Sequence, residues 1–153
     1  MKDIPLTRGK VALVDDEDYE RVNQFRWAAH KRGNTWYAYR NAPSFVRMHK
    51  FILAGHPEID HANGNGLDNQ KRNLRPATRS QNTANGQKHV DGLTSRFRGV
   101  SFSKESKRWV AYIGVSGHHF NLGYYDSEDD AAISYNHAAI AYFGEFARLN
   151  LVV

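Results

Sequence analysis

Short runs in which apolar and polar residues alternate dominate the first half of the chain, and they predict short strands. Turn-forming residues separate these runs, with Gly33 and Asn34 between two aromatic-rich stretches. The first half is therefore expected to hold four local elements: a strand pair over 4–14, a short helix opened by the acidic run 15–18, a hairpin over 27–40 and a short helix over 47–54.

The pattern changes after residue 96. Three alternating runs predict three short strands, over 97–102, 108–115 and 118–124. A capping-box sequence from Ser127 to Asp130 then predicts the start of a helix. Ala, Tyr and Phe at helical spacing predict that this helix continues to residue 143 with one face buried.

Residues 89–95 are polar and aperiodic, which predicts a linker between two domains. We expect an N-terminal domain over 1–88 and a C-terminal domain over 96–153, so that the chain as a whole is of the α+β class. The N-terminal core is expected to be two strands and a helix over about 58–86. The C-terminal domain is expected to be a three-stranded antiparallel sheet packed on one helix.

Basic charge is concentrated on part of the chain, whose formal net charge is +5. Residues 1–90 carry fifteen Lys and Arg against nine Asp and Glu, residues 94–116 carry five against one, and residues 117–153 carry one against five. This distribution predicts that a polyanion such as nucleic acid lies across some faces of the protein and not others.

The stretch 58–85 carries the residues best suited to chemistry. Asp60 and His61 are adjacent, Asn73 follows His61 by twelve positions, and Asn82 follows Asn73 by nine. A turn rich in Gly and Asn lies between His61 and Asn73, and a helix-start signal precedes Asn82. A strand, a loop, a second strand and a helix can bring one carboxylate, one imidazole and two carboxamides to one point.

These side chains suit metal-assisted hydrolysis of a phosphodiester. The Asp60 carboxylate and the Asn82 carbonyl are hard oxygen ligands, which Mg2+ and Mn2+ prefer. His61 titrates near neutrality and can take the proton from an attacking water. Asn73 can orient the imidazole by a hydrogen bond through its side-chain oxygen. The alternative is a hairpin whose Asx-rich loop caps its own backbone and whose His61 is merely solvated.

Asp60, His61, Asn73 and Asn82 together resemble the ββα-metal motif of HNH endonucleases, in the variant where Asn replaces the last His. The phrase DHANGNGLDNQKRNLR resembles the core of the HNH homing endonucleases of phages and introns, and the resemblance covers about residues 5–88. It implies a divalent cation and products with a 3′-hydroxyl and a 5′-phosphate. The chain has no cysteine, so no zinc cluster is expected.

Basic residues crowd the second part of this motif. Lys71, Arg72, Arg75 and Arg79 are expected to hold DNA phosphates, and the alternative is a solvated basic face. His49 precedes the motif. It is interpreted as a packing or hydrogen-bonding residue, with a phosphate contact as the alternative.

The C-terminal half resembles the plant Apetala-two, or ethylene-response-factor, DNA-binding domain over about residues 95–150. The matching phrases are FRGVSF, RWVAYIGV and FNLGYYDSEDDAAISYNHAAIAYFGEFARLN. That family lays a three-stranded sheet into the DNA major groove, with the helix behind it. By motif position, the resemblance implies a set of DNA-facing residues: Arg98, Gly99, Ser101, Ser103, Tyr112, Gly114, His119, Asn121 and Tyr124.

The chain departs from the plant pattern at several of these positions. The plant domains use Arg where Ser101, Ser103, Gly114 and His119 stand, and Trp at Asn121. Fewer cations predict weaker phosphate binding and a different base preference. The alternative is a protein-binding module built from the same sheet and helix.

Together these features predict a metal-dependent, site-recognising DNA endonuclease that acts as a monomer on double-stranded DNA. The N-terminal half cuts, and the C-terminal half supplies affinity and specificity. The alternative function is a DNA-binding regulator with an inactive nuclease scaffold. The chain has no long apolar run and no signal-peptide core at its N-terminus, so we expect no membrane association and a cytoplasmic protein. The resemblance to homing endonucleases implies that a phage or a bacterium encodes it.

Overall fold

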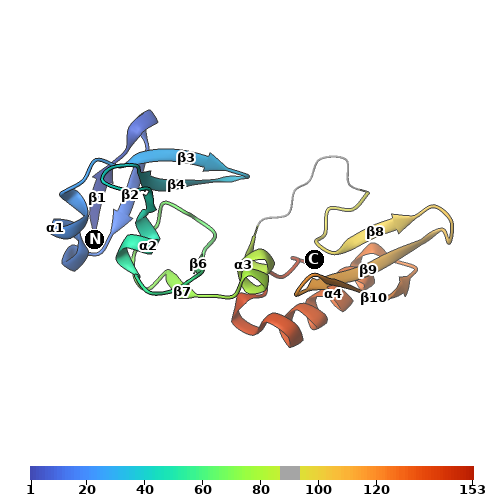
Figure 1. The fold of residues 1–153 in the computed structure, drawn as a ribbon. Coiled ribbons are helices and arrows are strands. Elements are labelled where there is room, and N and C mark those ends of the chain that lie inside the picture. The colour runs from blue at the N-terminus through green and yellow to red at the C-terminus, as the bar shows by residue number, and fades with distance from the viewer. Residues whose placement is uncertain (87–93) are drawn as a thin grey trace. The chain divides into compact units, whose positions relative to one another are not determined.

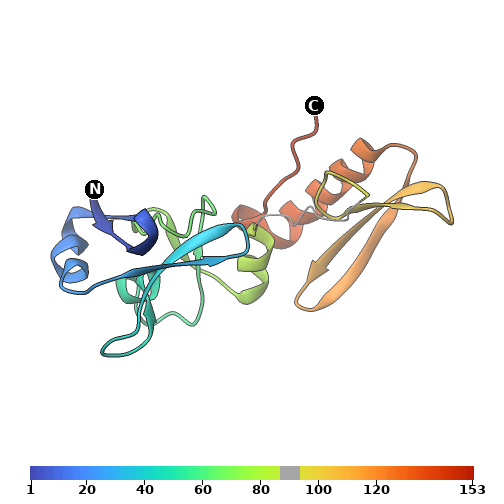
Figure 2. The ribbon, with the colours of Figure 1, turned by 90° about the horizontal axis from the view of Figure 1, so that it is seen from above.

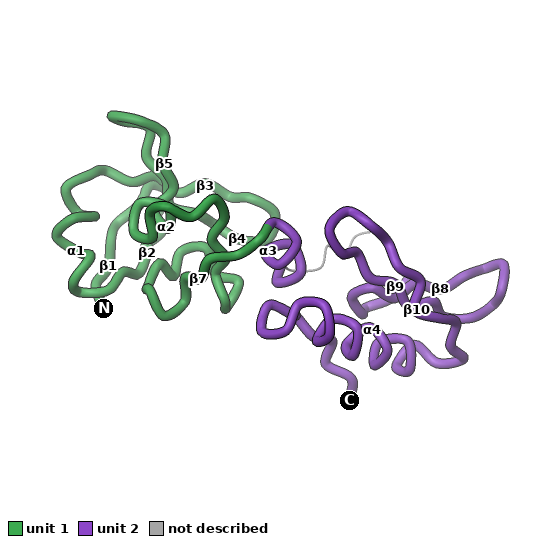
Figure 3. The backbone as a smooth tube through the Cα atoms, turned by 60° about the horizontal axis from the view of Figure 1, so that its bottom comes forward, with its two compact units in different colours: residues 1–78 green, residues 79–153 purple. Residues whose placement is uncertain are grey.

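The computed structural model describes residues 1–86 and 94–153, so most of the linker expected over 89–95 lies outside the described residues. The chain divides into two compact units, Met1–Thr78 and Arg79–Val153 (Figure 3). Helix α3 (Arg79–Asn85), which follows the candidate chemistry, is in the second unit, where it contacts α4 (Glu128–Phe143). The division into domains over 1–88 and 96–153 stays a prediction.

The first unit combines a three-stranded sheet, two strand pairs and two short helices (Figure 1). Its elements in chain order are β1 (Lys2–Pro5), β2 (Val11–Val14), α1 (Asp16–Asn23), β3 (Ala28–Arg32), β4 (Thr35–Arg40), β5 (Val46–Arg47), α2 (Met48–Ile52), β6 (Ile59–His61) and β7 (Leu74–Pro76). β1 pairs with β2, β4 lies between β3 and β5, and β6 pairs with β7, all antiparallel. The strand pair, the hairpin and the two helices expected from the sequence are confirmed.

One apolar core holds the elements of the first unit together. Its buried members are Ile4, Ala12, Val14, Val22, Trp27, Ala38, Met48, Ile52, Ile59 and Leu74. Ile59 and Leu74 belong to β6 and β7, a strand pair too short to be stable alone. Burying each of these two side chains contributes about 1.5–3 kcal/mol, so the core fixes the hairpin that carries Asp60 and His61.

The second unit is a three-stranded antiparallel sheet with α4 packed across one face (Figures 1 and 2). Its strands are β8 (Val100–Ser103), β9 (Arg108–Val115) and β10 (His118–Tyr125), and β9 lies in the middle. The Ser127 Oγ atom caps α4 by accepting a hydrogen bond from the Asp130 N–H over 3.0 Å, and Gly144 ends the helix. These findings confirm the α+β class, the capping box and the C-terminal sheet on one helix.

Small side chains let α4 approach the sheet closely. Ala131 and Ala132 of α4 and Ala111 of β9 are fully buried and share a core with Val100 and Phe97. Bulkier side chains at these positions would separate the helix from the sheet. Among the described residues, no helix combines the length and the apolar composition needed to span a membrane.

Gly99, just before β8, lies where the backbone and the packing both demand glycine. Its φ is +67°, and a Cβ there would lie 2.1 Å from Tyr135 Cδ2 and 2.5 Å from the Tyr112 carbonyl oxygen. We expect Gly99→Ala to lower the free energy of unfolding by about 2–5 kcal/mol, because overpacking and a left-handed backbone both destabilise. Denaturant unfolding followed by circular dichroism measures the loss.

Gly117→Ala is the matched control for this substitution. Gly117 also has a positive φ, +86°, but nothing lies within 4 Å of the added Cβ. Its loss should be only the backbone cost of about 1–2 kcal/mol. Equal losses for the two variants would contradict the tight packing of Gly99 on Tyr135.

Candidate active site

The adjacent acid and imidazole lie on β6, which pairs with β7. The register places Asp60 opposite Arg75 and His61 opposite Leu74. Asp60 and His61 are both buried, with exposed fractions of 3% and 5%. The structure therefore rules out a merely solvated histidine, the alternative that the sequence left open.

Arg75 balances the charge of the buried Asp60 carboxylate. Its Nε and Nη2 atoms both donate to Asp60 Oδ2, over 2.9 Å and 2.8 Å. The exposed fraction is 18% for the Arg75 side chain and 4% for that of Asp60. In such shielded surroundings, removing either partner leaves the other charge uncompensated. Arg75, which the sequence assigns to DNA phosphates, thus lies against the candidate metal ligand.

Two rings enclose the His61 imidazole. The His49 ring of α2 stands edge-on to it, with centroids 4.9 Å apart and an interplanar angle of 88°. The Tyr37 ring of β4 lies 5.7 Å from His61 and 6.0 Å from His49. The interpretation of His49 as a packing residue is confirmed. The part of Tyr37 was missed, because no spacing in the sequence links it to His61.

Burial favours the neutral form of both imidazoles. Loss of solvent lowers the pKa of His61, although interactions with Asn69, Asp60 and Asp68 act in the opposite direction. Burial, together with electrostatic interactions with His61, Arg47 and Lys50, lowers the pKa of His49 to about 3. A neutral imidazole can accept a proton, so His61 has the protonation state that a general base requires.

Side-chain hydrogen bonds close the loop between β6 and β7. Asn73 Oδ1 accepts from the Asn63 N–H over 2.9 Å, and Asn73 Nδ2 donates to the Asp68 carbonyl over 2.8 Å. Asn63 Nδ2 donates to Asp68 Oδ2 over 2.8 Å. The loop does cap its own backbone. The Asn73 oxygen that the sequence assigns to the imidazole here accepts from a loop N–H two residues after His61.

Strand β2 pairs with the same loop through backbone hydrogen bonds. The Leu13 N–H donates to the Leu67 carbonyl, and the Asn69 N–H donates to the Leu13 carbonyl, both over 2.8 Å. The loop is therefore attached to the strand pair at the start of the chain. Its Asn- and Gly-rich sequence makes turns, and β2 fixes where those turns lie.

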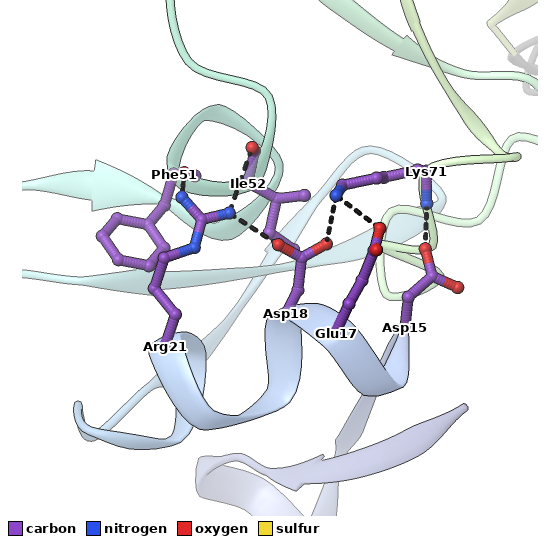
Figure 4. A network of polar contacts seen from close by, with 7 residues as sticks. All are labelled: Asp15, Glu17, Asp18, Arg21, Phe51, Ile52 and Lys71. Atoms are coloured by element: carbon purple, nitrogen blue, oxygen red, sulfur yellow. Dashed lines mark hydrogen bonds and ion pairs between the residues drawn. The ribbon is translucent and has the colours of Figure 1, made fainter.

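Helix α1 holds the loop by charge (Figure 4). The Lys71 N–H donates to Asp15 Oδ2 over 2.7 Å, and the Lys71 ammonium lies 2.5 Å from Glu17 Oε1 and 3.3 Å from Asp18 Oδ2. Arg21 pairs with Asp18 Oδ1 over 2.7 Å and donates to two carbonyls of α2. The three carboxylates lie close enough to hold a metal ion, within 4.8 Å. Lys71 contacts all three carboxylates and so ties the loop to the start of α1, and its contact with a DNA phosphate stays a prediction.

The remaining predicted residues of the motif belong to the loop and to α3. Arg72 is exposed on the loop, and Arg79 is exposed on α3. Asn82 is half-buried on α3, in the second unit, and its part in a metal site stays a prediction. Within the first unit, the structure brings together Asp60, His61, Asn73 and Arg75.

Alternation along β8, β9 and β10 separates two faces of the sheet. Val100, Ala111 and Ile113 are buried on the face that α4 covers. The register pairs Ser101 with Val110, Ser103 with Arg108, Asn121 with Tyr112, His119 with Gly114 and Tyr124 with Val110. Because paired residues point to the same side, all of these lie on the opposite face, which we call the outer face.

The outer face carries little free positive charge. Its arginine, Arg108, donates to Asp126 Oδ1 over 2.9 Å. Tyr112 and Tyr124 are 38% and 48% exposed, and His119 is exposed beside them. The outer face thus offers aromatic and neutral polar groups, and it holds seven of the predicted DNA contacts: Ser101, Ser103, Tyr112, Gly114, His119, Asn121 and Tyr124.

Arg98 and Gly99 precede this face and have packing contacts of their own. The Arg98 N–H donates to Asn150 Oδ1 over 2.7 Å, and Asn150 Nδ2 donates to the Arg98 carbonyl over 3.0 Å. The Arg98 guanidinium donates to the Gly86 carbonyl and interacts with the Tyr135 hydroxyl. Direct contact of Arg98 and Gly99 with DNA stays a prediction.

Comparison with known proteins identifies two kinds of relative. The chain is distantly homologous to an HNH endonuclease over its full length and to an AP2/ERF domain over its C-terminal part. The first relative is the uncharacterized HNH endonuclease L560 of Acanthamoeba polyphaga mimivirus, 28% identical over 153 residues, which cover 95% of this chain and 77% of that protein. The second is the AP2-like ethylene-responsive transcription factor TOE2 of Arabidopsis thaliana, 30% identical over 90 residues. That match covers 59% of this chain and spans 18% of the length of TOE2.

No protein-family model matches the chain. Both resemblances in the sequence are confirmed.

The burial of His49 predicts that the stability of the protein depends on pH. Below its ordinary pKa of 6.5, His49 takes up a proton in the unfolded chain, whereas folded His49, with a pKa of about 3, does not. Its contribution to stability is therefore complete above pH 6.5 and is lost as the pH falls below it. We expect the free energy of unfolding to fall by up to about 1.4 kcal/mol per pH unit for this residue.

Denaturant unfolding in EDTA at about pH 7 and about pH 5 measures this slope. His49→Phe keeps a ring against His61 but cannot take up a proton. It should therefore reduce the dependence of the unfolding free energy on pH by the part that His49 contributes. A slope that the substitution leaves unchanged would show that His49 is not the residue that titrates.

Proposed function

We propose that this chain is a divalent-metal-dependent DNA endonuclease of the HNH type with a C-terminal DNA-binding unit. The observation that carries the proposal is the buried His61 imidazole next to the buried Asp60 carboxylate on β6, in a chain homologous to an HNH endonuclease along its length. Homology of the C-terminal part to an AP2/ERF domain supports double-stranded DNA as the substrate.

Asp60 and Asn82 are the residues that would hold the cation, Mg2+ or Mn2+. Their side-chain oxygens are hard donors of the kind these ions prefer, and the Asp60 carboxylate is anionic enough to attract a guanidinium. The donor chemistry therefore fits a divalent cation. Bound there, the cation supplies stabilisation of the negative charge that builds on the phosphoryl and leaving oxygens.

His61 acts as the general base that takes the proton from the attacking water. The step needs a neutral imidazole, which burial favours. The Tyr37 and His49 rings restrict how the imidazole can turn. Asn73 acts on His61 through the loop that it closes immediately downstream. The products carry a 3′-hydroxyl and a 5′-phosphate.

The outer face of the second unit recognises the DNA site. Neutral polar and aromatic side chains suit contacts to base edges, which specify sequence, better than contacts to phosphates, which position the protein. The arginines near the candidate active site and at the start of the sheet supply the phosphate contacts: Arg72, Arg75, Arg79 and Arg98. The protein acts as a monomer on the duplex.

A DNA-binding regulator with an inactive nuclease scaffold is the second candidate. The ion pair between Arg75 and Asp60 favours it, because a guanidinium already satisfies the carboxylate that a metal needs. A plasmid-nicking assay with Mg2+ or Mn2+ and with EDTA separates the two functions. Nicking that EDTA abolishes supports the endonuclease, and no nicking with either metal supports the regulator.

His61→Ala should abolish cleavage while leaving DNA binding nearly intact. Losing a general base lowers the cleavage rate by about 10²–10⁴-fold, whereas a neutral His61 adds no electrostatic attraction to DNA. Nicking rates and fluorescence anisotropy with a labelled duplex measure the two quantities. The control is His56→Ala, an exposed histidine of the same unit, which should change neither. An equal loss of cleavage and of binding would contradict this division of roles.

Tyr112→Ala and His119→Ala should weaken site preference more than turnover. Each removes a side chain from the outer face, and a lost base contact costs about 1–3 kcal/mol of discrimination. Sequencing the cut ends of a random DNA library measures the preference, and nicking of plasmid at high concentration measures the turnover. Ile140→Ala, at an exposed position on α4, is the control. An unchanged preference would exclude the outer face as the reader of sequence.

A further inference from the structure

The guanidinium of Arg75 and a divalent cation would share one buried carboxylate. The Nε and Nη2 atoms of Arg75 donate to Oδ2 of Asp60 over 2.9 Å and 2.8 Å. The register of β6 and β7 sets the two residues opposite each other. Ile59 and Leu74, next to them on the same strands, are in the core. The backbone therefore places the two residues opposite each other.

The net charge of the Asp60–Arg75 pair determines how strongly a cation can bind there. The Asp60 side chain is 4% exposed, so its negative charge is poorly screened and is balanced by Arg75. A divalent cation on Asp60 adds two positive charges next to that guanidinium. Like charges at short range in shielded surroundings repel strongly. Cation binding is then favourable only when more negative charge comes near the pair.

We propose that Arg75 is a positioning residue that couples cation binding at Asp60 to DNA binding. This inference rests on the proposed function. Without DNA, Arg75 is the internal counter-ion that fixes the Asp60 carboxylate and opposes cation binding. A DNA phosphate brought beside the pair adds negative charge, which offsets the charge of the cation and attracts the guanidinium. The cation is then bound tightly only in the presence of DNA.

Arg75 suits this task better than the other basic residues of the loop. Lys71 is held by carboxylates of α1, and Arg72 is exposed, where solvent and salt screen its charge. A guanidinium can keep one hydrogen bond to a carboxylate while it turns another N–H to a phosphate. The sequence-based assignment of Arg75 to phosphates and its observed place on Asp60 are then two states of one residue.

The test measures Mn2+ binding to the full chain by calorimetry, and DNA binding by fluorescence anisotropy with and without Mn2+. A His61→Ala background keeps the duplex uncut. Because coupling is reciprocal, the factor by which Mn2+ raises DNA affinity equals the factor by which DNA raises Mn2+ affinity. We expect a factor of at least about five, the lower end of typical couplings.

In Arg75→Gln, Mn2+ should bind the free protein at least about fivefold more tightly, and the coupling factor should shrink by a similar amount. Arg75→Lys keeps the charge and should retain most of the coupling. Arg26→Gln removes the same charge from an exposed position of the first unit and should change Mn2+ affinity by less than about twofold.

Two outcomes would overturn the inference and spare the proposed function. One is Mn2+ affinity that is unchanged or weaker in Arg75→Gln while Asp60→Asn abolishes Mn2+ binding. The other is a protein with intact Arg75 whose Mn2+ affinity does not respond to DNA, which tests the idea even if Arg75→Gln fails to fold. If Asp60→Asn binds Mn2+ as tightly as the unchanged protein, the metal site of the proposed function is itself wrong.

Discussion

The Asp60 carboxylate and the His61 imidazole are both buried on β6, and the first unit is arranged to make this possible. An uncompensated buried carboxylate destabilises a fold by several kcal/mol, and Arg75 balances it from the paired position on β7. The same loss of solvent lowers the pKa of the imidazole and favours its neutral form. Burial on β6 therefore makes a counter-charge necessary for the acid and lowers the proton affinity of the base.

A strand pair as short as β6 and β7 cannot maintain that environment alone. Ile59 and Leu74 attach it to the core, and Asn73 closes the loop between the strands. Strand β2 pairs with this loop, and Lys71 connects it to the acidic start of α1. The acidic helix start is thus part of the support of the candidate active site. The constraint runs from the first strands of the chain to the motif more than forty residues later in sequence.

The two faces of the sheet in the second unit have different roles. One face packs on α4, and the outer face is the proposed surface for recognition. Small residues on α4 and on the strands let α4, including Tyr135, pack close to one face of the sheet. The outer face is not covered by α4, and Tyr112 and Tyr124 are exposed on it. That face is nearly free of unpaired positive charge, since Arg108 is engaged by Asp126. A surface of this chemistry gains selectivity from hydrogen bonds and apolar contacts, and it depends on arginines elsewhere in the chain for attraction to phosphates.

The sequence by itself determined those features that depend on residues close together in the chain. Alternation, the capping box at Ser127 and the Asx-rich loop after His61 depend on residues a few positions apart, so the elements and the two resemblances could be read directly. Tertiary structure decided the partners of the charged and titrating groups. It set Arg75 on Asp60, Lys71 on the carboxylates of α1, and the rings of Tyr37 and His49 around His61. These contacts join residues up to 54 positions apart. Burial and ion pairing depend on where the whole chain folds, and local patterns carry no information about that.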